Sequence, residues 1–297
     1  MRKILLALTS ELRRLKAAGV KTVPVSADTI SAFKSVVRAR ASGVAAVDAT
    51  ASYSKPVPKP DAVHESPSRA DSGFPPPPVV TLPSGDKHAQ MDWLRDRVLN
   101  DPVCLSHVRP GKRLVVGVGN LDAKIFFCGE APGADEEIQG EPFVGPAGQL
   151  LNRMIHGMGL KREEVYIGNI MNWRPDVPTH AGMEQSGNRP PTAEEMAYCL
   201  PYLKAQLQIV NPDVIVALGA TAGQGLLGMG SFKTLREIRG RWKLFSEKPV
   251  MVTYHPSYVL RNESNRVKRA VWEDLLQVME RIGLPISDKQ RGFFLNK

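Results

Sequence analysis

Residues 123–133 read Ala-Lys-Ile-Phe-Phe-Cys-Gly-Glu-Ala-Pro-Gly, a short apolar run that ends in a glycine-rich loop. Such a run, bounded by turn residues, is typical of a buried strand. Similar segments alternate along the chain, with further strands expected at 165–170, 213–218 and 250–254 and helices near 146–159, 192–210, 220–227 and 265–282. This alternation predicts an α/β fold around a central, mostly parallel sheet of four strands.

Chemically useful residues follow these four runs. Glu130, Asn169, Gly219 and His255 each come just after an expected strand. The carboxyl ends of parallel strands meet at one edge of a sheet, and sites in such folds gather there. We therefore expect these four segments to converge on one pocket.

Composition limits the class of protein. The chain has 297 residues, a net charge of +9 and three cysteines. The positive charge favours an anionic partner without establishing nucleic-acid binding. So few cysteines do not form a disulfide framework, which suggests a reducing, cytoplasmic location. The apolar run at 4–8 is followed at once by charged residues, too short for a signal peptide, and no run is long enough to cross a membrane.

The chain divides into four expected parts. Residues 1–51 contain two helical patterns, at 4–19 and about 27–41, and are expected to form a helical extension. Residues 52–86 are rich in Pro and Ser, including the run Pro75 to Pro78, which predicts a solvated linker. Residues 87–284 are expected to form the α/β domain and residues 285–297 a tail. No Walker-type phosphate loop occurs, which argues against a nucleotide triphosphatase.

The loop after the first strand has two interpretations. Gly129-Glu130-Ala131-Pro132-Gly133 is followed by acids and by Pro142-Phe143-Val144-Gly145. Its glycines would let the backbone approach a ligand, and its aromatic ring would stack on a planar group. Equally, the glycines of a surface loop can serve only turns. The loop alone does not decide between these interpretations.

Three motifs, taken in their order along the chain, distinguish the two interpretations of this loop. Three segments resemble the motifs of family 4 uracil-DNA glycosylases. They are the Gly-Glu-Ala-Pro-Gly loop with Pro-Phe-Val-Gly-x-Ala-Gly-x-Leu-Leu, the strand Ile167-Gly168-Asn169-Ile170, and His255-Pro256-Ser257-Tyr258. Three shorter segments also match the family: Gly187-Asn188-Arg189-Pro190-Pro191-Thr192, Leu218-Gly219-Ala220 and Arg239-Gly240-Arg241-Trp242. The resemblance therefore covers about residues 92–282. It implies a three-layer α/β/α fold.

The resemblance also implies residue roles. Phe143 would stack on a flipped uracil, Asn169 would read its edge, and His255 would stabilise the leaving base. Glu130 would position or activate water, and the backbone of Gly129, Ala131 and Gly133 would approach the base. DNA contacts would come from the residues around the closing motif: Ser257, Val259, Leu260 and Arg261.

Each role has a structural alternative. His255 before a proline can simply cap a strand end, and Asn169 can satisfy a turn. Glu136, another acid of the loop, can be a solvated surface residue. The ordered motifs favour the functional interpretation for Glu130, Phe143, Asn169 and His255, and favour the structural one for Glu136.

One feature of the resembled family is altered. The family ordinarily holds an iron-sulfur cluster with four cysteines, but the corresponding positions here are Asp101, Cys104, Trp173 and Cys199. An indole does not ligate iron. We therefore expect no cluster and no other cofactor, with Trp173 filling part of the space. Cys128, inside an expected strand, reads as a core residue.

The combined hypothesis is a monomeric uracil-DNA glycosylase that acts in base excision repair and leaves an abasic site. Two alternatives remain: a glycosylase with shifted base preference, such as hypoxanthine, and a protein that binds uracil or abasic sites without cutting. The partner is uracil-containing DNA. The tail sequence Gln290-Arg291-Gly292-Phe293-Phe294 faintly resembles sliding-clamp-binding peptides, the alternative being a tail that folds back on the domain.

Overall fold

The computed structural model describes residues 74–179 and 183–295. The two helices expected before residue 42 and residues 52–73 of the expected linker lie outside this range. Among the described helices, none has the length and apolar character needed to cross a bilayer.

A six-stranded sheet forms the centre of the domain, in the order β1-β3-β2-β4-β6-β5. Its four parallel strands are the expected ones: β2 (Ile125–Gly129), β3 (Tyr166–Asn169), β4 (Val214–Leu218) and β6 (Lys248–Thr253). Two short antiparallel strands at the edges, β1 (Val118–Gly119) and β5 (Trp242–Phe245), raise the expected count of four to six. The two edge strands are partly exposed and carry no continuous apolar run, so the pattern did not reveal them.

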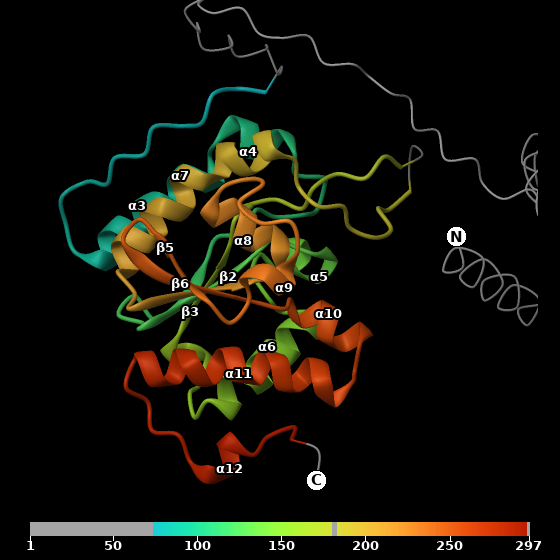
Figure 1. Cartoon of the computed structure of the whole chain (residues 1–297). Coiled ribbons are helices and arrows are strands. Elements are labelled where there is room, and N and C mark those ends of the chain that lie inside the picture. The colour runs from blue at the N-terminus through green and yellow to red at the C-terminus, as the bar shows by residue number, and fades with distance from the viewer. Residues whose placement is uncertain (1–73, 180–182, 296–297) are drawn as a thin grey trace, which may run out of the picture. The chain divides into compact units, whose positions relative to one another are not determined.

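Helices cover both faces of the sheet, as Figure 1 shows, and confirm the α/β/α class. One face packs against α3 (Lys87–Leu99), α4 (Pro102–Ser106), α7 (Ala193–Val210) and α8 (Ala220–Leu227). The other packs against α6 (Pro146–Gly157), α10 (Pro256–Arg261) and α11 (Asn265–Arg281). The shorter elements are α5 (Ala134–Gln139), η1 (Arg162–Glu164), α9 (Leu235–Ile238) and α12 (Asp288–Arg291).

Strand β2 shows why the apolar run predicts this arrangement. Phe126 and Cys128 point into the core shared with α3 and α7, whereas Ile125 and Phe127 point into the core shared with α6 and α11. Successive side chains of a strand face opposite ways, so a strand between two helical layers must be apolar at every position.

Part of the Pro-rich segment packs on the domain. Phe74, Val80 and Leu82 contact the core on the α3 and α7 side. The Phe74 ring also stacks on His107, with 5.9 Å between ring centroids. The packed part of the chain thus begins before residue 87, where the domain was expected to start.

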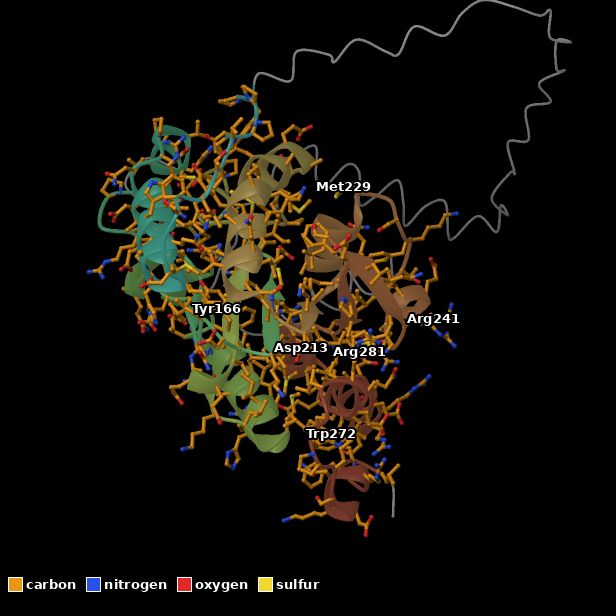
Figure 2. The ribbon with its side chains drawn as sticks, turned by 90° about the vertical axis from the view of Figure 1, so that its left-hand side faces the viewer. Tyr166, Asp213, Met229, Arg241, Trp272 and Arg281 are labelled. Carbon is orange, nitrogen blue, oxygen red and sulfur yellow. The ribbon has the colours of Figure 1, made fainter. Side chains whose placement is uncertain are left out.

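The C-terminal tail folds back along α11. Trp272 Nε1 donates to the carbonyl oxygen of Gln290 at 2.6 Å, and Gln290 Nε2 donates to that of Gly157 at 2.9 Å. The Phe293 ring lies 5.2 Å from the Trp272 ring. Figure 2 shows Trp272 on α11, on the side toward this segment. The tail therefore takes the folded-back arrangement that the sequence left open.

Candidate active site

A cavity of about 160 Å³ opens at the carboxyl edge of the sheet. Asn169 comes from the end of β3, His255 from the residues after β6, and Phe143 from the loop before α6. The full lining is Ala131, Gly133, Glu136, Phe143, Ala147, Asn169, Asn188, His255, Ser257 and Arg261. The segments after β2, β3 and β6 thus meet at one place as expected, whereas Gly219, after β4, is not in the lining. The volume corresponds to about five water molecules at ~30 Å³ each, which suits one small ring.

Asn169 lines this cavity with a side-chain amide whose oxygen has no hydrogen-bond partner. The residue is 5% exposed, and its Oδ1 is buried without a hydrogen-bond partner. A buried amide oxygen left unpaired costs about 1–3 kcal/mol, so such groups are rare unless a ligand completes them. Asn172 Oδ1 is buried and unpaired as well, but Asn172 lies outside the cavity lining, so the position of Asn169 in that lining is what makes its amide a candidate ligand group.

The backbone of Phe143 is held in an unusual conformation. Its φ is 54°, in the left-handed region that aromatic residues seldom adopt. Arg162 Nη1 and Nη2 donate to the carbonyl oxygens of Phe143 and Pro142, at 3.3 and 2.7 Å. A Cβ on Gly148 would lie 1.8 Å from the Phe143 oxygen, so only glycine fits there. Strain of this kind collects at functional sites because the surroundings hold it in place.

Gly129 allows the two recognition groups to approach each other. A Cβ at this position would lie 2.3 Å from Asn169 Oδ1 and 2.6 Å from Phe143 Cε2. Gly129 does not line the cavity. Its part is to leave room behind the ring and the amide, which differs from the expected backbone contact with the base.

His255 is held as a neutral hydrogen-bond donor. Ser257 N donates to His255 Nδ1 at 3.1 Å, so Nδ1 is an acceptor and the proton belongs on Nε2. Ser257 Oγ lies 2.8 Å from the same nitrogen. Burial, assisted by the positive charge of Arg261, lowers the pKa of His255 from 6.5 to about 4. At neutral pH the ring presents one N–H group.

Glu130 lies outside the cavity lining. It follows β2 directly, and its half-buried carboxyl group bonds to Thr221 in the first turn of α8. Burial raises the pKa of Glu130 above its ordinary value, and the Thr221 hydrogen bond only partly opposes this. The carboxyl group is thus at the right edge of the sheet, but it needs a bridging water or a rotation to reach a ligand.

Glu136 braces the loop. Its carboxylate accepts hydrogen bonds from the backbone N–H groups of Gly133, Val144 and Gly145, at 3.1 to 3.2 Å. These bonds tie the first half of the loop to the segment that carries Phe143. Glu136 is thus not the solvated surface acid of the structural alternative: it is half-buried, lines the cavity and holds the loop together.

Asn188 also lines the cavity, although the sequence motifs did not predict it as a site residue. Arg174 Nε donates to its Oδ1 at 2.8 Å, which leaves its Nδ2 free for a ligand. That Nδ2 lies 3.8 Å from where a Cβ of Gly133 would be. The Gly-Asn-Arg match at 187–189 was the available signal, but the loop from 175 to 192 has no periodic pattern that places it.

The expected DNA-contacting residues separate into buried and exposed ones. Val259 is only 4% exposed and packs in the core shared with α6 and α11, so it is not available for DNA. Leu260 is half-buried and Arg261 exposed. Tyr258, 38% exposed and stacked on Tyr254 at 4.9 Å, is the outward aromatic residue of α10. Because α10 is a helix, adjacent residues point different ways, which the motif alone does not show.

The four residues that the resemblance assigns to cluster positions, two of them cysteines and two not, lie together in the core. Asp101 accepts hydrogen bonds from the hydroxyl groups of Tyr198 and Tyr202, at 2.9 and 2.7 Å, and from Cys104 N at 2.8 Å. Burial opposes ionisation of Asp101, but these bonds outweigh it and hold its pKa below the ordinary value. Cys104 and Cys199 are free thiols, and a hydrogen bond between them, together with burial, raises the pKa of Cys104.

Trp173 occupies the third of these positions. It is 1% exposed and stacks on His107 with 4.7 Å between ring centroids. Its indole N–H is a donor only and cannot ligate iron. Two buried thiols, a carboxylate committed to tyrosines and an indole do not fit a four-thiolate cluster. In the described part of the chain, no three His, Cys, Asp or Glu side chains meet as metal ligands.

A larger apolar groove of about 310 Å³ lies elsewhere, between α6, α10 and α11. Leu150, Val271 and Trp272 are among its lining residues. None of the unpaired buried polar atoms found in the described residues belongs to that lining. The smaller cavity is therefore the better candidate, because specific recognition needs convergent polar groups.

Comparison with known proteins identifies the family. A model of the uracil DNA glycosylase superfamily matches residues 116–276. A type-4 uracil-DNA glycosylase from Thermotoga maritima is 43% identical over 188 residues, covering 62% of this chain and 91% of the relative. A type-4 enzyme from Archaeoglobus fulgidus is 43% identical over 154 residues, covering 49% and 71%. A type-5 enzyme from Pyrobaculum aerophilum is 28% identical over 167 residues, covering 55% and 72%.

Proposed function

The chain belongs to the uracil-DNA glycosylase superfamily, and we propose that it hydrolyses the N-glycosidic bond of uracil in DNA, leaving an abasic site for base excision repair. Such an enzyme must extrude the nucleotide from the helix, recognise the base in a pocket and cleave the bond to the sugar. The positive net charge of +9 favours the DNA backbone as partner.

The unpaired amide oxygen of Asn169 carries the proposal. Uracil presents an N3–H donor beside its O4 acceptor, and an amide presents the complementary acceptor and donor. Cytosine has an unprotonated N3 and an amino group at these places. It would leave the buried Oδ1 unpaired or require the amide to turn, so a site of this kind discriminates against it.

Phe143 and His255 would act on the base that Asn169 reads. Both rings line the cavity, with 5.6 Å between their centroids. Phe143 would stack on the uracil ring. As the bond to the sugar breaks, negative charge develops on the base, and the Nε2–H group of neutral His255 would donate to a carbonyl oxygen that gains it. Ser257 would serve this step by holding Nδ1 as an acceptor.

Water would attack the sugar from the side of the loop after β2. Glu130, with its raised pKa, is suited to position or activate this water once a bridging molecule connects it to the site. The Nδ2 of Asn188 offers a second polar contact at the cavity wall. On the DNA side, Leu260 and Tyr258 would fill the space left by the flipped nucleotide, and exposed Arg261 would hold a phosphate.

Single-uracil oligonucleotides test the proposal directly. We expect the full chain to convert them to abasic product. Asn169→Ala should lower kcat at least tenfold, because it removes the amide that would hydrogen-bond to the edge of the base. Asn172→Ala is the matched control. Asn172 is another buried amide, 2% exposed, that bonds to the carbonyl oxygen of Val115 and lies outside the cavity.

The outcomes separate the candidate functions. Cleavage of hypoxanthine but not uracil would indicate a shifted base preference. Binding to uracil DNA without product would indicate a non-catalytic binding protein. Equal losses in Asn169→Ala and Asn172→Ala would show that the first variant reports only on stability. Glu130→Gln, compared with wild type over pH, tests the proposed role in water activation.

The chain is further proposed to act without the iron-sulfur cluster of its family. The support is the chemistry of the four positions, where an indole and a tyrosine-bonded carboxylate replace two thiolates. Iron and acid-labile sulfide analysis of purified protein, with its visible absorption spectrum, measures this directly. Stoichiometric iron together with loss of activity on chelation would refute it.

Partner and location complete the proposal. The protein is proposed to be monomeric and cytoplasmic, which sedimentation and fractionation measure. A weak sliding-clamp contact through the tail would require Gln290 and Phe293 to leave their places against Gly157 and Trp272. Deletion of residues 286–297 should abolish clamp binding if the contact exists.

A further inference from the structure

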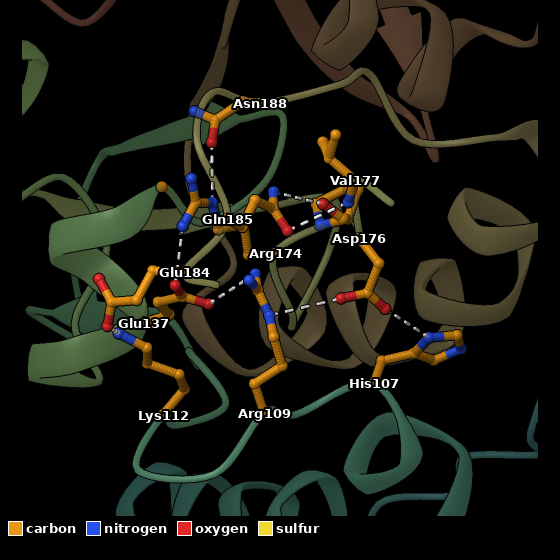
Figure 3. A network of polar contacts seen from close by, with 12 residues as sticks. His107, Arg109, Lys112, Glu137, Arg174, Asp176, Val177, Glu184, Gln185 and Asn188 are labelled. Atoms are coloured by element: carbon orange, nitrogen blue, oxygen red, sulfur yellow. Dashed lines mark hydrogen bonds and ion pairs between the residues drawn. The ribbon is translucent and has the colours of Figure 1, made fainter. Parts of the chain in front are cut away.

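Arg174, itself buried, occupies the centre of a polar network that reaches from buried Glu137 to exposed Asn188, as Figure 3 shows. Its side chain is 5% exposed and makes three hydrogen bonds in three directions. Nη1 donates to Glu137 Oε1 on α5 at 2.8 Å, Nη2 to the carbonyl oxygen of Gly187 at 2.7 Å, and Nε to Asn188 Oδ1 at 2.8 Å. One guanidinium thus ties the loop after β3 to α5 and to the turn that carries Asn188.

The bond to Asn188 determines how its amide is turned. A guanidinium group only donates, so it can face the amide oxygen and not the amide nitrogen. The Oδ1 of Asn188 therefore points to Arg174, and in Figure 3 its nitrogen points away. Because Asn188 lines the cavity, the group offered to a ligand is the N–H donor. Without Arg174, the amide would be free to present its oxygen instead.

We propose that Arg174 is a positioning residue for the glycosylase reaction, which acts by holding the Asn188 amide with its N–H group toward the cavity. This inference rests on the proposed function of the cavity. Arg174 itself lies outside the lining of that cavity. Its contribution should therefore pass entirely through Asn188.

Glu137 has a separable part in the same network. It is 4% exposed and pairs with Arg174 at 2.8 Å and with Arg109 at 3.6 Å. This carboxylate compensates the buried charge of Arg174, and breaking such a pair is destabilising. The Glu137 side chain pairs with Arg174 and Arg109, and bonds neither to Asn188 nor to a residue of the cavity lining. Stability and amide orientation can thus be perturbed independently.

Four variants of the full chain test the inference on single-uracil DNA: Arg174→Lys, Asn188→Ala, the double variant, and Glu137→Gln as control. Lysine keeps the charge but cannot make the three hydrogen bonds that the planar guanidinium group makes in fixed directions. We expect Arg174→Lys and Asn188→Ala each to lower kcat by roughly tenfold or more, and the double variant to be no worse than Asn188→Ala. Glu137→Gln should lower the Tm but keep kcat within about twofold of wild type.

Several results would overturn the inference. These are a wild-type kcat in Arg174→Lys, losses that multiply in the double variant, or an equal loss of kcat in Glu137→Gln at a matched decrease in Tm. Wild-type protein inactive on uracil DNA would instead overturn the proposed function. In that event the side-chain amide signal of Asn188 in ¹⁵N spectra still tests the positioning. It should shift or broaden in Arg174→Lys and stay unchanged in Glu137→Gln, and the reverse pattern would refute it.

Discussion

Acidification should destabilise the folded protein through His255. Burial, with the charge of Arg261, holds its pKa at about 4, below the ordinary value of 6.5. Between these two pH values His255 is protonated in the unfolded chain and neutral in the folded chain. The stabilisation from neutral His255 is therefore complete above pH 6.5 and is lost as the pH falls toward 4. At about 1.4 kcal/mol for each tenfold change in acidity, the full loss is roughly 3 kcal/mol.

Urea unfolding between pH 7.5 and 3.5 measures this loss when wild type is compared with His255→Gln, which does not titrate. The free energy of unfolding of wild type minus that of the variant should fall by roughly 3 kcal/mol across this interval. Uracil excision by wild type should show no inflection near pH 6.5 from this residue. A pH-independent difference between the two proteins, or an imidazole titration by NMR with a midpoint near 6.5, would refute the neutral, buried histidine.

Three further outcomes follow from the packing. Gly129→Ala should abolish detectable excision while leaving a folded protein, because its Cβ would overlap Asn169 Oδ1 at 2.3 Å; activity near that of wild type would contradict the close approach. Trp173→Ala should lower the free energy of unfolding by about 3–5 kcal/mol, because it empties a fully buried site, and added iron should not restore the loss in urea titrations. Val259→Ala should lower the free energy of unfolding by roughly 1–3 kcal/mol and leave DNA affinity unchanged. Leu260→Ala should weaken DNA binding with little change in Tm. The opposite pattern would reverse the two assignments.

The four parallel strands and the four long helices after residue 145 were predictable from sequence to within about two residues at most boundaries. Their signals are local, because a strand between two helical layers is apolar throughout and a covering helix is apolar on one face. β1 and β5 could not be predicted this way. They are short, lie at the sheet edges and owe their pairing to neighbours distant in sequence.

The site shows the same division. Asn169 and His255 were expected to meet because each follows a strand end, and Phe143 because the resemblance assigned it to the base; all three share a cavity. Glu130 was expected there because it too follows a strand end, yet its side chain turns toward Thr221. Position after a strand determines which edge of the sheet a residue occupies, but the rotamer and the neighbouring helix decide which way its side chain points.

The sequence alone determined the α/β class and the edge of the sheet where chemistry collects, since these depend on residue type and local periodicity. Only the tertiary structure decided that Asn169 keeps a lone amide oxygen, that Ser257 selects the His255 tautomer and that Arg174 turns Asn188 toward the cavity. Hydrogen bonds between segments far apart in the chain have no periodic trace in sequence, because they form only after packing has brought their partners together.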